Sequence, residues 1–150
     1  MPDICLTRMS PYTAEQMFDL VIDVDNYHAF VPHCRGSHIL SRELQSNGDT
    51  HLLADLSVAY KFLRETYRSE IIAATDKSGL QVRQVKGPFH HLYNQWDFIP
   101  AQNGCTITYT LEFDFAVPLL GRLLQPMMPR VVEKFIASFE SRADTIYKTN

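Results

Sequence analysis

The hydrophobic pattern changes its period at Pro118, and this change limits the fold more than any other feature of the sequence. Between residues 105 and 117 apolar residues alternate with threonine and acidic residues, as in a strand with one buried face. The apolar members are Ile107, Tyr109, Leu111, Phe113, Phe115 and Val117. Beyond Pro118 the apolar residues follow the 3.6-residue period of an amphipathic helix. They are Val131, Val132, Phe135, Ile136, Phe139, Ala143 and Ile146.

Shorter patterns place the other elements. Residues 3–9 predict a strand, and Thr13 with Gln16 forms a capping-box pattern at which a helix begins. Turn signals at 47–49 and 76–79 separate period-two segments, which is typical of antiparallel hairpins. Only the last helix is long enough to cover such a sheet, so we predict one α+β domain over residues 1–150. In it a curved antiparallel sheet wraps around the C-terminal helix, with an internal hydrophobic cavity where the two do not meet closely.

The composition restricts the class of protein. Of 150 residues 45% are hydrophobic and 21% are charged, which is typical of a globular chain. The formal net charge of −3 argues against general nucleic-acid binding, so DNA is not an expected partner. Three scattered cysteines predict free thiols, and neither a signal peptide nor an apolar run of about 18 residues is present. We expect a cytoplasmic protein, with a peripheral position at the inner membrane as the alternative.

Strand alternation and helix periodicity predict which residues line the cavity. The predicted lining consists of Ala54, Leu56, Val58, Tyr60, Tyr67, Val82, Trp96, Phe98, Tyr109, Leu111 and Phe113, closed by Val132, Phe135 and Phe139. The aromatic members supply apolar area, and the tyrosine hydroxyls supply a few polar points, which suits a lipid with a polar ring. The alternative is that these side chains simply fill the core. An error of one residue in register would reverse a whole strand.

Residues 119–128 form an apolar segment that Pro126 and Pro129 separate from the main helix. Two interpretations are open for its leucines, which are Leu119, Leu120, Leu123 and Leu124. They pack on the sheet as core, or they form a lid that contacts a membrane surface and admits a lipid. The single charge of Arg122 and the two methionines are compatible with an interfacial segment.

The residues that could act in catalysis or bind a metal do not form a recognisable catalytic or metal-binding motif. His28, His33, His38 and Cys34 do not have the spacing of a structural zinc site. His33 precedes Cys34 directly, but neighbours in sequence do not by themselves have the hydrogen-bond geometry of a catalytic pair. No Gly-x-Ser-x-Gly or phosphate-loop motif occurs, so we expect no catalytic residue, no metal and no cofactor. Basic residues offer one alternative, a cluster that contacts ribosomal RNA. Its members would be Arg8, Arg35, Arg42, Lys61, Arg64, Arg68 and Arg83.

Two motifs carry a resemblance to a known family. The first is Tyr27-x-x-Phe30-Val-Pro32, and the second is Gly87-Pro-Phe89-x-x-Leu92-x-x-x-Trp96-x-Phe98. Segments 11–21, 62–65 and 111–115 extend the match over almost the whole chain. Together they resemble the coenzyme Q-binding START-like family of the polyketide cyclase/lipid transport superfamily.

The resemblance implies a helix-grip fold with a hydrophobic tunnel that binds ubiquinone or a related isoprenoid lipid. It further implies a non-catalytic role in respiratory electron transport. Some bacterial relatives are ribosome-association toxins, so the resemblance also implies the large ribosomal subunit as an alternative partner. A cyclase-type enzyme is the third and weakest implication, because no two residues of the sequence can be assigned as general acid and general base.

Overall fold

Seven antiparallel strands form one sheet in the computed structural model, which describes residues 3–61 and 63–148. The strands are β1 (Ile4–Ser10), β2 (Cys34–Leu44), β3 (Thr50–Tyr60), β4 (Leu63–Ala73), β5 (Gly79–Lys86), β6 (Phe89–Ala101) and β7 (Gly104–Phe115). Their order across the sheet is β1-β7-β6-β5-β4-β3-β2, so β1 closes one side by pairing with the last strand. Phe62, one residue of the family motifs, lies outside the described residues.

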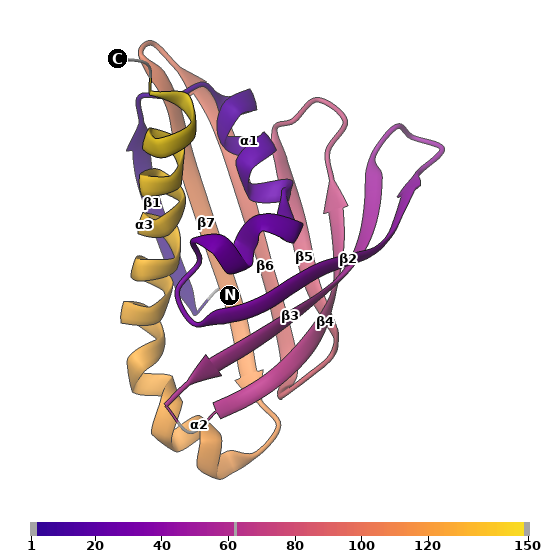
Figure 1. Cartoon of the computed structure of the whole chain (residues 1–150), viewed down its shortest axis with the longest axis vertical. Helices are drawn as coiled ribbons and strands as arrows, with labels where there is room; N and C mark the ends of the chain where they lie inside the picture. Colours follow the sequence, from indigo (N-terminus) through magenta and orange to yellow (C-terminus); the bar gives the residue numbers. More distant parts are fainter. Residues whose placement is uncertain (1–2, 62, 149–150) are drawn as a thin grey trace.

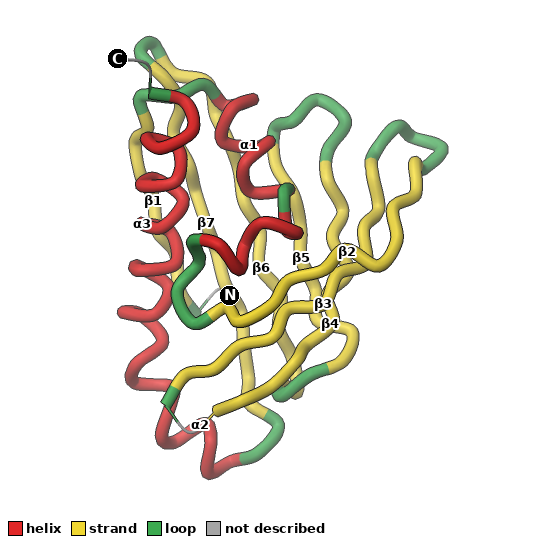
Figure 2. The backbone as a smooth tube through the Cα atoms, viewed as in Figure 1, coloured by secondary structure: helices red, strands yellow, loops and turns green. Residues whose placement is uncertain are grey.

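The helices lie on one side of this sheet (Figures 1 and 2). They are α1 (Ala14–Ile22), the 3-10 helix η1 (Val24–Ala29), α2 (Pro118–Leu124), the 3-10 helix η2 (Gln125–Met127) and α3 (Met128–Tyr147). The predicted helix-grip α+β fold is therefore confirmed. None of the helices in the described part of the chain combines the length and the apolar character needed to cross a membrane.

Local sequence signals explain where the helices begin. Thr13 Oγ1 accepts a hydrogen bond from the Gln16 backbone N–H at 3.1 Å, and Gln16 Oε1 accepts one from the Thr13 N–H at 2.9 Å. This is the predicted capping box of α1. Pro118, Pro126 and Pro129 stand in the first turns of α2, η2 and α3, where a missing N–H costs little. Each proline stops the preceding segment and begins the next.

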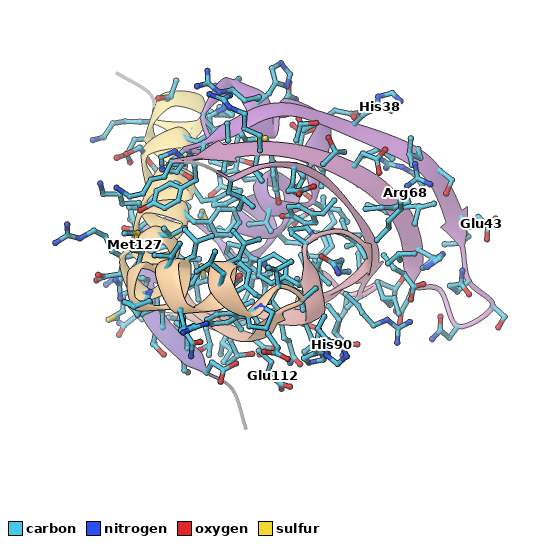
Figure 3. All side chains as sticks on the ribbon, turned by 90° about the horizontal axis from the view of Figure 1, so that it is seen from below. His38, Glu43, Arg68, His90, Glu112 and Met127 are labelled. Carbon is cyan, nitrogen blue, oxygen red and sulfur yellow. The ribbon has the colours of Figure 1, made fainter. Side chains whose placement is uncertain are left out.

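Bulges give the sheet its curvature. The pairing register shifts between Cys34 and Gly36, between Ile39 and Ser41, between Arg68 and Ser69, and between Phe89 and His91. A bulge bends and twists the strand that carries it. Figure 3 looks along the molecule from the end at which α2 lies and shows the sheet curving around the side chains on its concave face. We call this end the α2 end and the opposite one the α1 end.

Aromatic side chains fill the concave face toward the α1 end. The Trp96 ring lies 5.2 Å from the Phe139 ring and 6.0 Å from the Phe98 ring, measured between centroids. Phe18 of α1 packs edge-on against Phe98 at 6.2 Å. Because α1 and α3 both add rings to this cluster, the α1 end is solidly packed, and the sheet and α3 separate only toward the α2 end.

Candidate functional site

A cavity of about 190 Å³ lies between the sheet and α3 at the α2 end. Residues from β3, β4, β6 and β7 line it on the sheet side, and residues of α2 and α3 line it on the helical side. The segment between η1 and β2 contributes Val31, Pro32 and His33, and β2 contributes its first residue, Cys34. The Tyr60 hydroxyl lies 3.5 Å from Met127 Sδ and so joins the end of β3 to η2 at this end of the cavity.

The structure brings eight of the predicted residues together around this cavity. They are Leu56, Val58, Tyr60, Tyr67, Tyr109, Leu111, Val132 and Phe135. They come from β3, β4, β7 and α3, which are separated by up to about half of the chain. Strand alternation and helix periodicity thus selected residues that share the interior of the fold, and we treat them as the candidate binding site.

The other six predicted residues do not line the cavity. Ala54, Trp96, Phe98 and Phe139 do face the interior, with exposed fractions of 1%, 2%, 1% and 1%, but they lie in packed core. Val82 and Phe113 are partly buried and pack against the same core. The physical reason is that alternation predicts which side chains of a strand point inward. It does not predict where along the strand other side chains fill the interior and where the cavity begins.

Sequence reasoning missed several lining residues. Tyr27, Phe89, Leu92, Asn94 and Phe115 are the main ones on η1 and the sheet. Leu92 and Phe115 carried the signal of inward parity on their strands, and Asn94 carried a stronger one, because it shares the inward parity of Leu92 and Trp96 yet is polar. The loop residues carried none, since their position depends on contacts distant in sequence.

The four leucines of α2 divide into two faces. Leu119 and Leu123 are 59% and 46% exposed, whereas Leu124 is 2% exposed and lines the cavity. Leu120 is half-buried. The membrane-facing prediction is therefore wrong for Leu124, which belongs to the core. Residues four apart lie on the same face of a helix. The helical spacing alone therefore pairs Leu119 with Leu123 and Leu120 with Leu124. Val117 is also exposed, because β7 ends at Phe115.

The cavity is apolar and contains no Lys, Arg, Asp or Glu among its lining residues. Burial raises the pKa of Tyr67 and of Tyr109, and the proximity of Tyr67 raises the pKa of Tyr109 further. Burial also raises the pKa of Tyr27, whose hydroxyl donates a hydrogen bond to the Val21 carbonyl. The three phenols therefore remain neutral in the folded protein, and a charged ligand group would find no counter-charge here.

We expect stability to fall steeply above pH 10. Tyr27, Tyr67 and Tyr109 have folded-state pKa values above the usual tyrosine value, so they contribute fully to the free energy of unfolding below a pH of about 10. As the pH rises further, the unfolded chain loses protons that the folded chain retains. Each of these tyrosines then lowers the free energy of unfolding by about 1.4 kcal/mol per pH unit. Urea unfolding between pH 8 and 11 measures this slope. The double variant Y67F/Y109F should have a shallower slope, and an unchanged slope would contradict the assignment.

The groups considered for catalysis or metal binding have structural contacts instead. Burial raises the pKa of the Cys34 thiol, and its Sγ lies 3.4 Å from the Gly36 carbonyl oxygen. The His33 ring packs edge-on against Tyr60 at 4.6 Å. Within residues 3–61 and 63–148, no group of three His, Cys, Asp or Glu side chains could hold a metal ion.

Three of the seven basic residues considered as a cluster are engaged in ion pairs. Arg68 pairs with Asp55 at 2.8 Å, and Arg83 pairs with Glu70 at 2.8 Å on the outer face. Arg8 lies 3.5 Å from Glu133 on α3. Lys61 of the predicted set is exposed toward the α2 end and has no ion pair with a described residue, and the same holds for Lys86, Arg122 and Arg130. The α2 end therefore presents several unpaired cations although the formal net charge of the whole chain is −3.

Comparison with known proteins identifies the family. The family model described as polyketide cyclase / dehydrase and lipid transport matches residues 10–140. The chain is 30% identical over 145 residues to the ribosome association toxin RatA of Rickettsia prowazekii, covering 95% of this chain and 96% of the relative. It is 34% identical over 151 residues to the mitochondrial coenzyme Q-binding protein COQ10 homolog B of Xenopus laevis, covering 94% of this chain and 57% of the relative.

A solved structure whose sequence identity to this chain is similar to that of these relatives has the same architecture. The solution structure of an 18 kDa protein from Caulobacter crescentus superposes with a TM-score of 0.79 at 32% identity, covering 97% of this chain and 98% of the other. Family model, relatives and structure all match over nearly the full chain. The chain therefore belongs to the polyketide cyclase / dehydrase and lipid transport family, the START-like family that its motifs resemble.

Proposed function

We propose that this protein binds ubiquinone or a related isoprenoid lipid in the cavity without catalysis, and that it acts as a lipid chaperone for respiratory electron transport. The apolar cavity at the α2 end is the observation that carries the proposal. A family whose description includes lipid transport and a relative named as coenzyme Q-binding support it. No cofactor takes part, since the lipid is the ligand.

Extraction of the purified protein tests this proposal directly. Protein expressed in a quinone-producing host should release a quinone into organic solvent, identified by mass spectrometry. Titration with a quinone should also quench Trp96, whose ring lies 4.8 Å from Tyr109 and 5.8 Å from Phe135 of the cavity wall. A protein that carries no quinone and whose fluorescence does not respond would contradict the proposal.

The surface of α2 supports a transient contact with a membrane. Leu119 and Leu123 are exposed on α2, whose Leu124 lines the cavity, and the cations Arg122 and Arg130 lie at the same end. Exposed apolar side chains flanked by cations are typical of a segment that enters the headgroup region of an anionic bilayer. We infer a cytoplasmic protein that visits the inner membrane to load or release its lipid through this end.

Replacing Leu123 by aspartate should weaken binding to anionic liposomes about tenfold or more, because a carboxylate is poorly tolerated below the headgroups. The variant should remain folded, since Leu123 is 46% exposed. Ile146 is a matched control, because it is 47% exposed but lies on α3 at the α1 end. Cosedimentation with liposomes measures both variants. Equal losses in L123D and I146D would exclude α2 as the membrane-contacting element.

Ribosome association is the second candidate function. The relative from Rickettsia prowazekii named as a ribosome association toxin matches over 96% of its length, and four unpaired cations surround the α2 end. A local basic surface can bind ribosomal RNA in a salt-dependent way even in an acidic protein. Cosedimentation with large ribosomal subunits at low salt tests this function. A bound fraction that R122E/R130E removes and L123D retains would favour the ribosome over the membrane.

A further inference from the structure

Three polar side chains of the cavity lining differ from the others because they have a polar atom without a partner, whereas the Tyr27 and Tyr60 hydroxyls contact the Val21 carbonyl and Met127 Sδ. Asn94 on β6 is only 9% exposed, and its Oδ1 has no hydrogen-bond partner among the described residues. Tyr67 on β4 and Tyr109 on β7 line the same cavity, and their hydroxyls form no hydrogen bond with the described part of the chain. A buried polar group without a partner destabilises a fold, so the unpaired Asn94 Oδ1 beside two free phenol hydroxyls points to a ligand that completes them.

The chemistry of these groups selects the kind of ligand. Two phenol O–H groups donate hydrogen bonds, and the Asn94 amide can donate and accept. A quinone carbonyl accepts from such donors, and the hydroxyl of a quinol donates to an amide oxygen. Since no cation lines the cavity, a carboxylate or a diphosphate would be buried without a counter-charge, at high cost. The site therefore favours a neutral oxygen-bearing ring over fatty acids and prenyl diphosphates.

The position of the three groups determines the direction of binding. Tyr109 packs against Trp96 at 4.8 Å, so it stands beside the aromatic core that closes the α1 end. The lining at the other end, toward α2, includes Tyr60, Leu124 and Met128. A volume of about 190 Å³ is below the roughly 300–1,000 Å³ that encloses a drug-sized ligand, so it holds a ring but not a long tail.

We propose that Asn94, Tyr67 and Tyr109 bind the carbonyl-bearing ring of a neutral lipid, which enters ring first while its apolar tail leaves the cavity beside α2. The proposal rests on the proposed lipid-binding function and adds the recognition group, the class of head group and the orientation. The tail then extends toward Leu120 and Leu123, where the protein is expected to contact the membrane. This orientation removes the polar ring from the membrane and leaves the tail at the surface.

Competition against the neutral dye Nile red in the cavity tests the proposal with three probes. Decylubiquinone carries a ring with carbonyls, n-decylbenzene carries a similar tail on a ring without oxygen, and palmitate carries a charge. We expect decylubiquinone to bind about tenfold more tightly than n-decylbenzene or palmitate. The double variant N94L/Y109F should weaken decylubiquinone binding about 10–100-fold and leave n-decylbenzene binding unchanged. Y93F is the matched control, because Tyr93 on the same strand donates to Gln95 Oε1 at 3.1 Å away from the cavity.

A stability measurement gives a readout independent of binding. Replacing Asn94 by leucine removes an unsatisfied buried group at nearly constant volume, so the melting temperature of ligand-free N94L should rise by about 2–4 °C. A fall would mean that Asn94 is satisfied within the protein and would overturn its role in ring binding.

The outcomes separate this inference from the proposed function. Equal binding of decylubiquinone and n-decylbenzene, insensitive to N94L/Y109F, would overturn ring recognition while leaving apolar lipid binding intact. Tight binding of palmitate would overturn the preference for a neutral head group. Binding of none of the probes would contradict both the inference and the proposed function.

Discussion

Replacing Leu124 by aspartate should destabilise the protein by about 3–5 kcal/mol, a large part of a typical total of about 5–15 kcal/mol. Leu124 is 2% exposed and lines the cavity, and no Lys or Arg among the lining residues could pair with a new carboxylate there. The melting temperature should fall by about 6–20 °C, or the protein should fail to accumulate in folded form. Circular dichroism during thermal unfolding measures the change.

The neighbouring leucine provides the control for this prediction. Leu123 is 46% exposed on a different face of α2, so L123D should change stability by no more than about 0.5 kcal/mol. The contrast separates two roles within one short helix, because Leu124 attaches α2 to the core and Leu123 faces the surroundings. Two equally stable variants would mean that α2 is not docked on the sheet, and the cavity would then be open on this side.

The overall fold could be predicted because each element carries a local signal. Leu111 alternates with Thr110 and Glu112 along β7, and the inward face of that strand follows directly. Thr13 and Gln16 place the start of α1, and Pro129 places the start of α3. With sequential hairpins and one long helix, few arrangements bury all apolar faces, so the architecture follows from patterns that extend over only a few residues.

The extent of the candidate site could not be predicted because it depends on contacts distant in sequence. Trp96 and Leu92 have the same inward parity on β6, but only Leu92 lines the cavity. Phe139 of α3 lies against Trp96 and excludes it from the cavity, and nothing in the sequence near Trp96 records that contact. Val31 and His33 line the cavity because of the path of a loop, and a loop has no periodic pattern from which this could be predicted.

Asn94 is the exception among the residues that were missed. A polar residue at an inward position of a strand breaks the agreement between local pattern and core packing, and such conflicts concentrate at functional sites. The same criterion selects Ser69, which is 2% exposed with an unpaired Oγ on β4. Ser69 does not line the cavity, so the criterion finds candidates but cannot by itself separate a binding group from a tolerated core hydroxyl.

Truncating Phe139 to alanine should cost about 3–5 kcal/mol, because it removes the ring at the centre of the packed α1 end. Phe139 is 1% exposed, and its ring lies within 5.2 Å of those of Tyr27, Phe30 and Trp96 and 5.1 Å from that of Phe135. No other ring in the described part of the chain joins η1, β6 and α3 in this way. Urea unfolding measures the loss, and F139L, which retains most of the volume, should lose less than about 1.5 kcal/mol.

The same variant tests the division between packed core and cavity. Phe139 separates the cavity from the α1 end through its contacts with Phe135 and Trp96, so F139A should extend the empty volume toward α1. Binding of decylubiquinone should persist in F139A wherever the protein remains folded, since Asn94, Tyr67 and Tyr109 are unchanged. A loss of binding as large as that of N94L/Y109F in a folded F139A protein would mean that the aromatic core is itself part of the binding site, and that the boundary between core and cavity lies closer to α1.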